Sequence, residues 1–121
     1  MKYNAMKKWV KALRSGRFKQ GRAKLATYEI DDVTGDNIGD ELSFCCLGVL
    51  CEINDVPFRI GDDELLGDDA LERLGFKTLN GKLPKSYKTK NGEVNDLAAL
   101  NDMGLSFKQI ANIIEKNYKH L

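Results

Sequence analysis

One segment limits the fold more than any other. Residues 43–53 form a nearly continuous apolar run inside a chain of 121 residues of which 31% are charged. Four members of this run repeat at helical spacing and share one helix face: Cys46, Val49, Leu50 and Ile53. We therefore predict a central buried helix, with Ser43 as its N-cap and Asn54 close to its end. Periodicity alone also allows a strand over residues 44–50.

Helical signals occur in four other segments, which are residues 4–15, 68–74, 96–103 and 107–118. Asn95 and Ser106 are placed to cap the last two of these helices, and Gly104 separates them. The apolar positions of the last helix fall on one face; they are Phe107, Ile110, Ala111, Ile113 and Ile114. The C-terminal third is therefore predicted to be a pair of packed helices.

The remaining segments indicate short strands and loops. We expect a strand over residues 23–30, a solvated acidic loop over 31–41, a short extended piece over 56–60 and a small β element over 76–94. Asn80-Gly81 and Asn91-Gly92 are typical turn dipeptides of this last region. The predicted fold class is α+β, a single compact helix-rich domain (residues 1–121) with a small β element and a C-terminal helix-turn-helix-like αα-hairpin.

Charge is distributed in three blocks, although the net charge is only +1. Residues 1–28 hold nine basic residues and no acidic one, residues 29–72 hold fourteen acidic residues and one basic one, and residues 73–121 are basic again. A concentrated positive block attracts phosphates, nucleic acid or an acidic protein surface. The same pattern is also expected if the basic ends fold against the acidic middle.

The basic block contains a short segment bracketed by glycines, residues 16–21, which continues to Arg22. Such a loop can bring backbone amides and several cationic side chains to one anion. The candidate ligand-binding residues are Arg14, Arg17, Phe18, Lys19, Gln20 and Arg22, with Phe18 offering a stacking face. The expected ligand is a phosphate-bearing small molecule, or else an acidic surface of another protein.

Catalysis and metal binding have little support in the residue pattern. The one histidine, His120, has no recognisable catalytic partners, and no cofactor motif occurs. Three cysteines, Cys45, Cys46 and Cys51, fall short of the four ligands of a structural zinc site, so we expect them in the core. The acidic loop does not have calcium-loop spacing. We expect a binding protein without catalytic residues, cofactor or metal; an enzyme using the acidic middle is the less favoured alternative.

Residues 96–118 resemble the helix-turn-helix segments of DNA-binding proteins, with Gly104 in the turn. If this segment bound DNA, Lys108, Gln109 and Asn112 would project from the second helix towards bases and phosphates. An αα-hairpin that packs on the core has the same periodicity. A DNA-binding regulator is therefore the alternative function.

Three blocks together resemble a family of small proteins encoded by bacteriophages and prophages. They are residues 9–21, residues 44–51, and residues 97–102 with 106–111. The first two blocks often lie closer together in that family, so the acidic loop is a longer connection here. The resemblance implies a phage accessory protein in the bacterial cytoplasm that acts by binding, either blocking a host protein or sequestering a nucleotide signal of antiviral defence.

Two further expectations concern location and assembly. No stretch approaches the roughly 20 apolar residues that a membrane-spanning helix needs, and the first nine residues lack the apolar core of a secretory signal. We therefore expect a cytoplasmic protein with no membrane partner. A large cationic patch is also compatible with a symmetric homo-oligomer.

Overall fold

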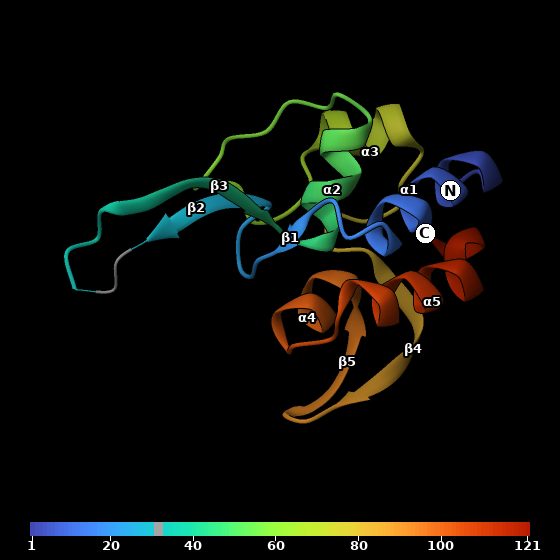
Figure 1. The fold of residues 1–121 in the computed structure, drawn as a ribbon. Coiled ribbons are helices and arrows are strands. Elements are labelled where there is room, and N and C mark those ends of the chain that lie inside the picture. Colours follow the sequence, from blue (N-terminus) through green and yellow to red (C-terminus); the bar gives the residue numbers. More distant parts are fainter. Residues whose placement is uncertain (31–32) are drawn as a thin grey trace.

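The computed structural model describes residues 1–30 and 33–121 and confirms the α+β class. The helices are α1 (Tyr3–Arg14), α2 (Cys46–Ile53), α3 (Asp68–Leu74), α4 (Leu97–Asp102) and α5 (Phe107–Asn117), followed by a 3-10 turn, η1 (Tyr118–His120). The strands are β1 (Lys19–Gln20), β2 (Ala26–Ile30), β3 (Asn37–Phe44), β4 (Lys82–Thr89) and β5 (Gly92–Asp96). Figure 1 shows α1, α2, α4 and α5 gathered around the centre.

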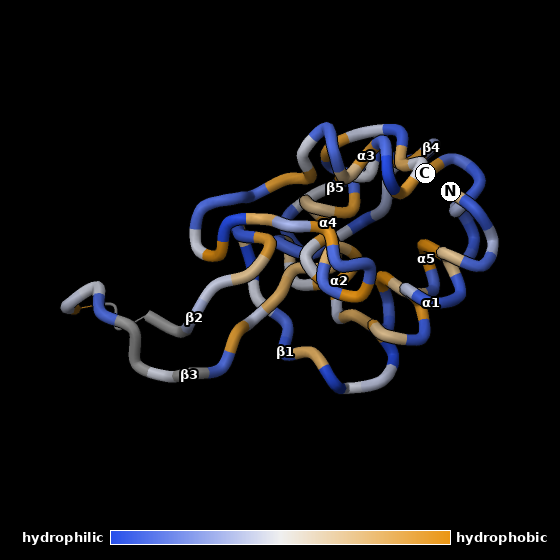
Figure 2. The backbone as a smooth tube through the Cα atoms, turned by 90° about the horizontal axis from the view of Figure 1, so that it is seen from above, coloured by the Kyte–Doolittle hydropathy of each residue, from blue (hydrophilic) through white to orange (hydrophobic). Residues whose placement is uncertain are grey.

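Helix α2 forms the middle of the hydrophobic core, as its sequence predicts. All of its residues from Cys46 to Cys51 are buried, and α1 and α4 pack against it. Helix α1 contributes Trp9, whose indole Nε1 donates a 2.9 Å hydrogen bond to the carbonyl oxygen of Cys46. Figure 2 shows hydrophobic stretches in these central helices and hydrophilic ones in the outer loops. The apolar run therefore organises the fold around itself.

Helix α5 packs along α1 and so brings the two ends of the sequence together. The five apolar positions predicted for this helix are all buried. Its N-terminus has the predicted cap: the Ser106 hydroxyl accepts from the Gln109 amide, and the Gln109 side chain accepts from the Ser106 amide. The paired helices of the C-terminal third are therefore confirmed.

Two small sheets flank the helices. In the first, β1 runs parallel to β3 and β2 runs antiparallel to it, in the order β1-β3-β2. The β2–β3 pair projects from the body as an arm (Figure 1). In the second, β4 and β5 form an antiparallel hairpin in which Thr89 pairs with Gly92. The turn residues are therefore Lys90 and Asn91, one position before the predicted Asn91-Gly92 dipeptide, and Gly92 begins β5.

The start of the central helix differs from the prediction. Ser43 does not cap it, because Ser43 lies in β3 and pairs with Lys19 and Thr27 on either side. The N-cap is Cys45, whose Sγ accepts from the Gly48 amide at 3.4 Å. The prediction of an acidic loop over residues 31–41 is also wrong for residues 37–41, because these belong to β3. Residues 31–32 of the predicted loop lie outside the described residues.

Two other local predictions were wrong. Residues 56–60 do not form a strand, because their polar groups are satisfied locally: the Val56 amide donates to the Cys51 carbonyl oxygen at 3.0 Å and the Arg59 amide to the Asp63 carboxylate at 2.8 Å. The cap of α4 is Asp96 rather than Asn95, and its carboxylate accepts from the Ala99 amide at 2.8 Å. Within the described residues, no helix has the length and apolar character that crossing a membrane requires.

The chain passes very close to itself at Gly48. The Cys45 amide donates to the Leu25 carbonyl oxygen at 3.1 Å, which holds residue 25 directly against α2. A Cβ atom on residue 48 would overlap with this same carbonyl group. Only glycine therefore allows the approach of the β2 segment to the central helix.

We expect Gly48→Ala to lower the free energy of unfolding by roughly 3 kcal/mol, because two backbone segments must separate to admit one methyl group. Urea denaturation would measure this loss. Gly67→Ala is the control, since no atom lies within 4 Å of the added Cβ. Equal stability of the two variants would contradict the close packing described above.

The three cysteines are buried, as predicted, and burial raises their pKa values. The pKa of Cys45 rises from the ordinary 9.0 to about 11 and that of Cys51 to about 12, while Cys46 also lies well above 9.0. Desolvation of the thiolate is the main cause in each case.

We expect all three thiols to resist a thiol-specific reagent at pH 8 in the folded protein and to react after unfolding in denaturant. Unfolded thiols ionise near pH 9 while the folded ones stay protonated, so the unfolded chain binds fewer protons above that pH. The free energy of unfolding should therefore fall as the pH rises from about 9 towards 11. Rapid labelling of the native protein at pH 8 would contradict this prediction.

Candidate functional site

A cleft of about 640 Å³ lies between the tip of the β4–β5 hairpin and the turn that joins α4 to α5. Its lining has a basic part, made by Arg22, Lys88 and Lys90, and a second part that includes Met103, Leu105 and Gln109. Arg22 comes from the basic N-terminal block and the two lysines come from the hairpin. Three cations from two distant segments of the sequence therefore line one hollow, which we call the hairpin cleft.

Arg22 occupies an unusual backbone turn. The Lys24 amide donates to the Arg22 carbonyl oxygen at 2.8 Å, which closes a three-residue turn with Ala23 at its centre. Ala23 has a φ of 68°, a left-handed conformation that disfavours a residue with a Cβ atom. Such strain persists only where the surrounding structure fixes the backbone, and it is frequent at functional sites.

The C-terminal end of α4 supplies the groups that fix this turn. The Asp102 carboxylate accepts from the Ala23 amide at 2.9 Å, immediately after Arg22. Immediately before it, the Asn101 side-chain amide donates to the Gly21 carbonyl oxygen at 2.7 Å. Two consecutive side chains of α4 therefore hold the backbone on both sides of Arg22.

The Arg22 side chain lies against the α4–α5 turn at Gly104. A Cβ atom placed on residue 104 would lie 3.3 Å from Arg22 Nη2, which is tighter than ordinary contact, and the φ of Gly104 is 98°. Glycine at this position therefore allows the positive φ of the turn and leaves space for the Arg22 guanidinium group. Among the ion pairs of the described residues, none involves Arg22, Lys88 or Lys90.

Asn101 also joins the site to the core. Its side-chain oxygen accepts from the Cys46 amide at 3.2 Å and from Gln20 Nε2 at 3.1 Å. Gln20 in turn donates to the Leu105 carbonyl oxygen at 2.7 Å and accepts from the Phe107 amide at 3.1 Å. Gln20 is one of the predicted ligand-binding residues, but both the nitrogen and the oxygen of its side-chain amide form hydrogen bonds within the fold.

The other predicted ligand-binding residues are divided between two places. Arg14 donates to Asn112 at 2.7 Å and pairs with Glu115 at 3.1 Å, and its hydrogen bond holds the pKa of Glu115 below its ordinary value. Phe18 is partly buried, with its ring edge against Phe44 at 5.2 Å. Arg17 stacks on Phe18 at 4.8 Å, and Lys19 is exposed in β1. Only Arg22 of this set lines the hairpin cleft.

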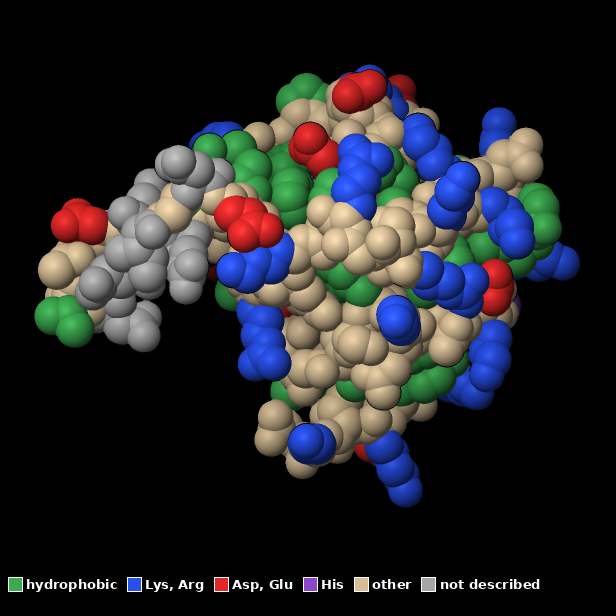
Figure 3. Space-filling model, viewed as in Figure 1, with side chains coloured by type: hydrophobic (Ala, Val, Ile, Leu, Met, Phe, Trp, Pro, Cys, Tyr) green, Lys and Arg blue, Asp and Glu red, His purple; other side chains and the backbone are tan. Residues whose placement is uncertain are grey.

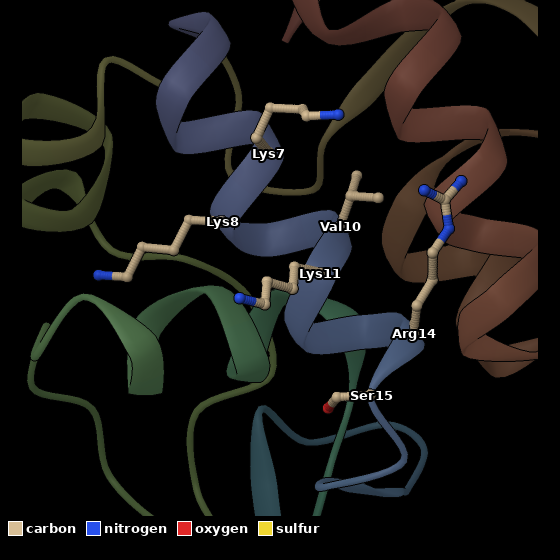
Figure 4. A pocket seen from close by; sticks show the side chains of 6 residues that line it. All are labelled: Lys7, Lys8, Val10, Lys11, Arg14 and Ser15. Atoms are coloured by element: carbon tan, nitrogen blue, oxygen red, sulfur yellow. The ribbon is translucent and has the colours of Figure 1, made fainter.

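Arg14 instead borders a second, shallower hollow on α1, of about 750 Å³. Its other lining residues all belong to α1 or follow it directly; they are Lys7, Lys8, Val10, Lys11 and Ser15. Figure 4 shows Lys8 and Lys11 pointing to one side of the helix and Arg14 to the other, towards α5. Basic side chains spread over this face of the molecule from α1 to the hairpin tip (Figure 3). The basic N-terminal block therefore supplies two surfaces rather than one.

The residues predicted to contact DNA have different environments. Lys108 is exposed at the start of α5. The side-chain oxygen of Gln109 is used in the capping box, and the side-chain oxygen of Asn112 accepts from Arg14. Gln109 also lines the hairpin cleft, so the two sets of residues predicted from the sequence meet at this place.

Lys88, Lys90, Met103 and Leu105 were missed by the sequence analysis. The signal for the lysines was available, because both closely precede the predicted Asn91-Gly92 turn in a stretch rich in lysine. Their position opposite Arg22 depends on tertiary packing, which one sequence does not reveal. Within residues 1–30 and 33–121, no three His, Cys, Asp or Glu side chains are grouped so that they could hold a metal ion.

Comparison with known proteins gives one partial match. A family model described as a domain of unknown function (DUF8296) matches residues 1–56, which extend from α1 through the end of α2. This region contains Arg22 but neither the hairpin nor α4 and α5. Searches of curated proteins and of solved structures find no match.

We expect Asp102→Ala to lower the free energy of unfolding by about 1–2 kcal/mol, because the Ala23 amide loses a charged acceptor while its strained turn remains. Asp102→Asn is the matched variant, since its side-chain oxygen can still accept the hydrogen bond. Chemical denaturation of both proteins checks the prediction. If the asparagine variant lost as much stability as the alanine variant, the hydrogen bond would not be what holds the turn.

Proposed function

We propose that this protein is a non-catalytic binder of a small phosphate-bearing molecule and that the hairpin cleft holds the phosphate. The observation that carries the proposal is Arg22, whose backbone is held by a strained turn and by Asn101 and Asp102, and which lines the same cleft as Lys88 and Lys90. An arginine guanidinium group binds phosphate oxygens in a bidentate manner, and lysines add mobile positive charge. The fixed arginine would set the position of the phosphate.

Electrostatics support an anionic occupant. Three cations around one hollow repel one another, and among the described residues no carboxylate is paired with any of them. A bound phosphate would replace this repulsion by attraction. Because such a ligand binds the folded state alone, it would also raise the stability of the protein by mass action.

The biological role that we propose rests on the resemblance of residues 9–21, 44–51 and 97–111 to small bacteriophage and prophage proteins. In that setting the protein would act in the bacterial cytoplasm as a counter-defence factor that sequesters a nucleotide signal. An acidic surface of a host protein is the other occupant compatible with its basic character. The match of residues 1–56 to a domain of unknown function adds no activity to this proposal.

DNA binding through α4 and α5 is the competing proposal. It has the exposed Lys108 in its favour, but Asn112 and Gln109 use their side-chain oxygens within the fold. It predicts binding of duplex DNA that weakens steeply between about 50 and 200 mM salt and that depends on Lys108. The phosphate proposal predicts instead a dependence on Arg22.

Isothermal titration calorimetry with inorganic pyrophosphate at low salt tests the proposal. We expect saturable binding by the natural sequence and at least a roughly tenfold rise of Kd in Arg22→Ala, the loss of a charged hydrogen bond. The double variant Lys88→Ala/Lys90→Ala should also bind more weakly. Arg73→Ala is the control, because Arg73 lies on α3 and pairs there with Asp69.

Circular dichroism would first establish that each variant is folded. Pyrophosphate binding of unchanged affinity in Arg22→Ala, or no binding by the natural sequence at millimolar concentration, would overturn the proposal. Duplex DNA binding that is lost in Lys108→Ala, without pyrophosphate binding, would replace it by the DNA-binding function.

A further inference from the structure

We infer that the hairpin cleft recognises a nucleobase next to the phosphate, so that its ligand is a nucleoside phosphate; this inference rests on the proposed function. The part of the cleft beside Arg22 contains Met103 and Leu105, which come immediately before and after Gly104. Since Arg22 lies against Gly104, an apolar surface begins where the phosphate site ends. A simple inorganic anion would leave that surface unused.

The two apolar side chains have the properties that stacking on a base requires. Both are half-buried and line the cleft, and Leu105 also packs against the hydrophobic core. A flexible methionine thioether interacts favourably with flat aromatic rings. The leucine would cover further apolar surface of the same ring. Together they provide a surface that accepts a ring without fixing its identity.

Gln109 adds a hydrogen-bonding group at the edge of this surface. Its side-chain oxygen accepts from the Ser106 amide, and this bond holds the amide group at the start of α5. No other described residue takes a hydrogen bond from Gln109 Nε2, although the residue lines the cleft. The capping box therefore leaves an oriented N–H donor for an acceptor on the ring edge of a base.

The dimensions of the cleft agree with a ligand of this size. Its volume of about 640 Å³ lies within the range of roughly 300–1,000 Å³ that is usual for sites of small organic ligands. Phosphate-binding cations, an apolar surface and one amide donor also form the mixture of groups typical of such sites. A nucleoside phosphate presents groups complementary to all three: a phosphate, an apolar ring face and acceptors on the ring edge.

Isothermal titration calorimetry on the full chain can compare the Kd of adenosine diphosphate with the Kd of inorganic pyrophosphate. We expect adenosine diphosphate to bind roughly tenfold more tightly, the gain that burial of about 60 Å² of apolar surface supplies. Leu105→Ala should remove most of this preference, measured as the ratio of the two Kd values in the same variant. Leu79→Ala is the matched control, because that leucine is 40% exposed and lies outside the cleft.

Met103→Ala serves as the second variant should Leu105→Ala unfold. A short single-stranded oligonucleotide, tested in parallel, distinguishes a free nucleotide from a nucleotide within a chain as the source of the base. Equal affinities for adenosine diphosphate and pyrophosphate, both dependent on Arg22, would overturn this inference and leave the proposed function intact. Absence of binding for both would overturn the proposed function as well.

Discussion

The fold depends on one buried side chain, Asn101, whose amide group joins three distant parts of the chain. It donates to the Gly21 carbonyl oxygen and accepts from the Cys46 amide and from Gln20 Nε2. The side chain is fully buried, so each bond left unmade would cost about 1–3 kcal/mol. No apolar residue of similar size can replace these bonds. This one amide therefore links the N-terminal loop, the central helix and the α4–α5 turn, in addition to the packing of α2 against α4.

This amide network also explains how a strained turn persists at Ala23. A left-handed alanine costs of order 1 kcal/mol or more, and an isolated loop would relax it. Here the backbone has no freedom to relax, because Asn101 holds the residue before Arg22 and Asp102 holds the residue after it. Packing in the core offsets the cost of this strained turn, which itself sets the backbone conformation at Arg22 on the surface. The backbone position of the exposed Arg22 therefore depends on contacts that reach back to the buried helix α2.

The sequence predicted the fold where periodicity and capping decide the structure and failed where long-range pairing decides it. Helix α5 was predicted correctly, including its Ser106 cap, because a capping box is a local signal. Ser43 was misassigned because its strand partners, Lys19 and Thr27, are distant in the chain. The candidate site shows the same division. Both Arg22 and Gln20 were predicted to bind a ligand from their basic surroundings. Arg22 lines the hairpin cleft, whereas long-range hydrogen bonds engage the Gln20 side chain in the Asn101 network.

The hairpin cleft is built from two parts of the chain, and each part would contribute differently to anion binding. The region matched by the family model contributes Arg22 and the Gly21 carbonyl that Asn101 holds. The clamp, the hairpin lysines and the apolar surface all come from beyond residue 56. Within the matched region, the loop is paired with β3 as far as Gly21, but the side chains that hold the backbone on either side of Arg22 are missing. Under the proposed function, affinity for an anion would come from the arginine, but a defined site would require the second half of the chain, because Asn101 and Asp102 preorganise the backbone around Arg22.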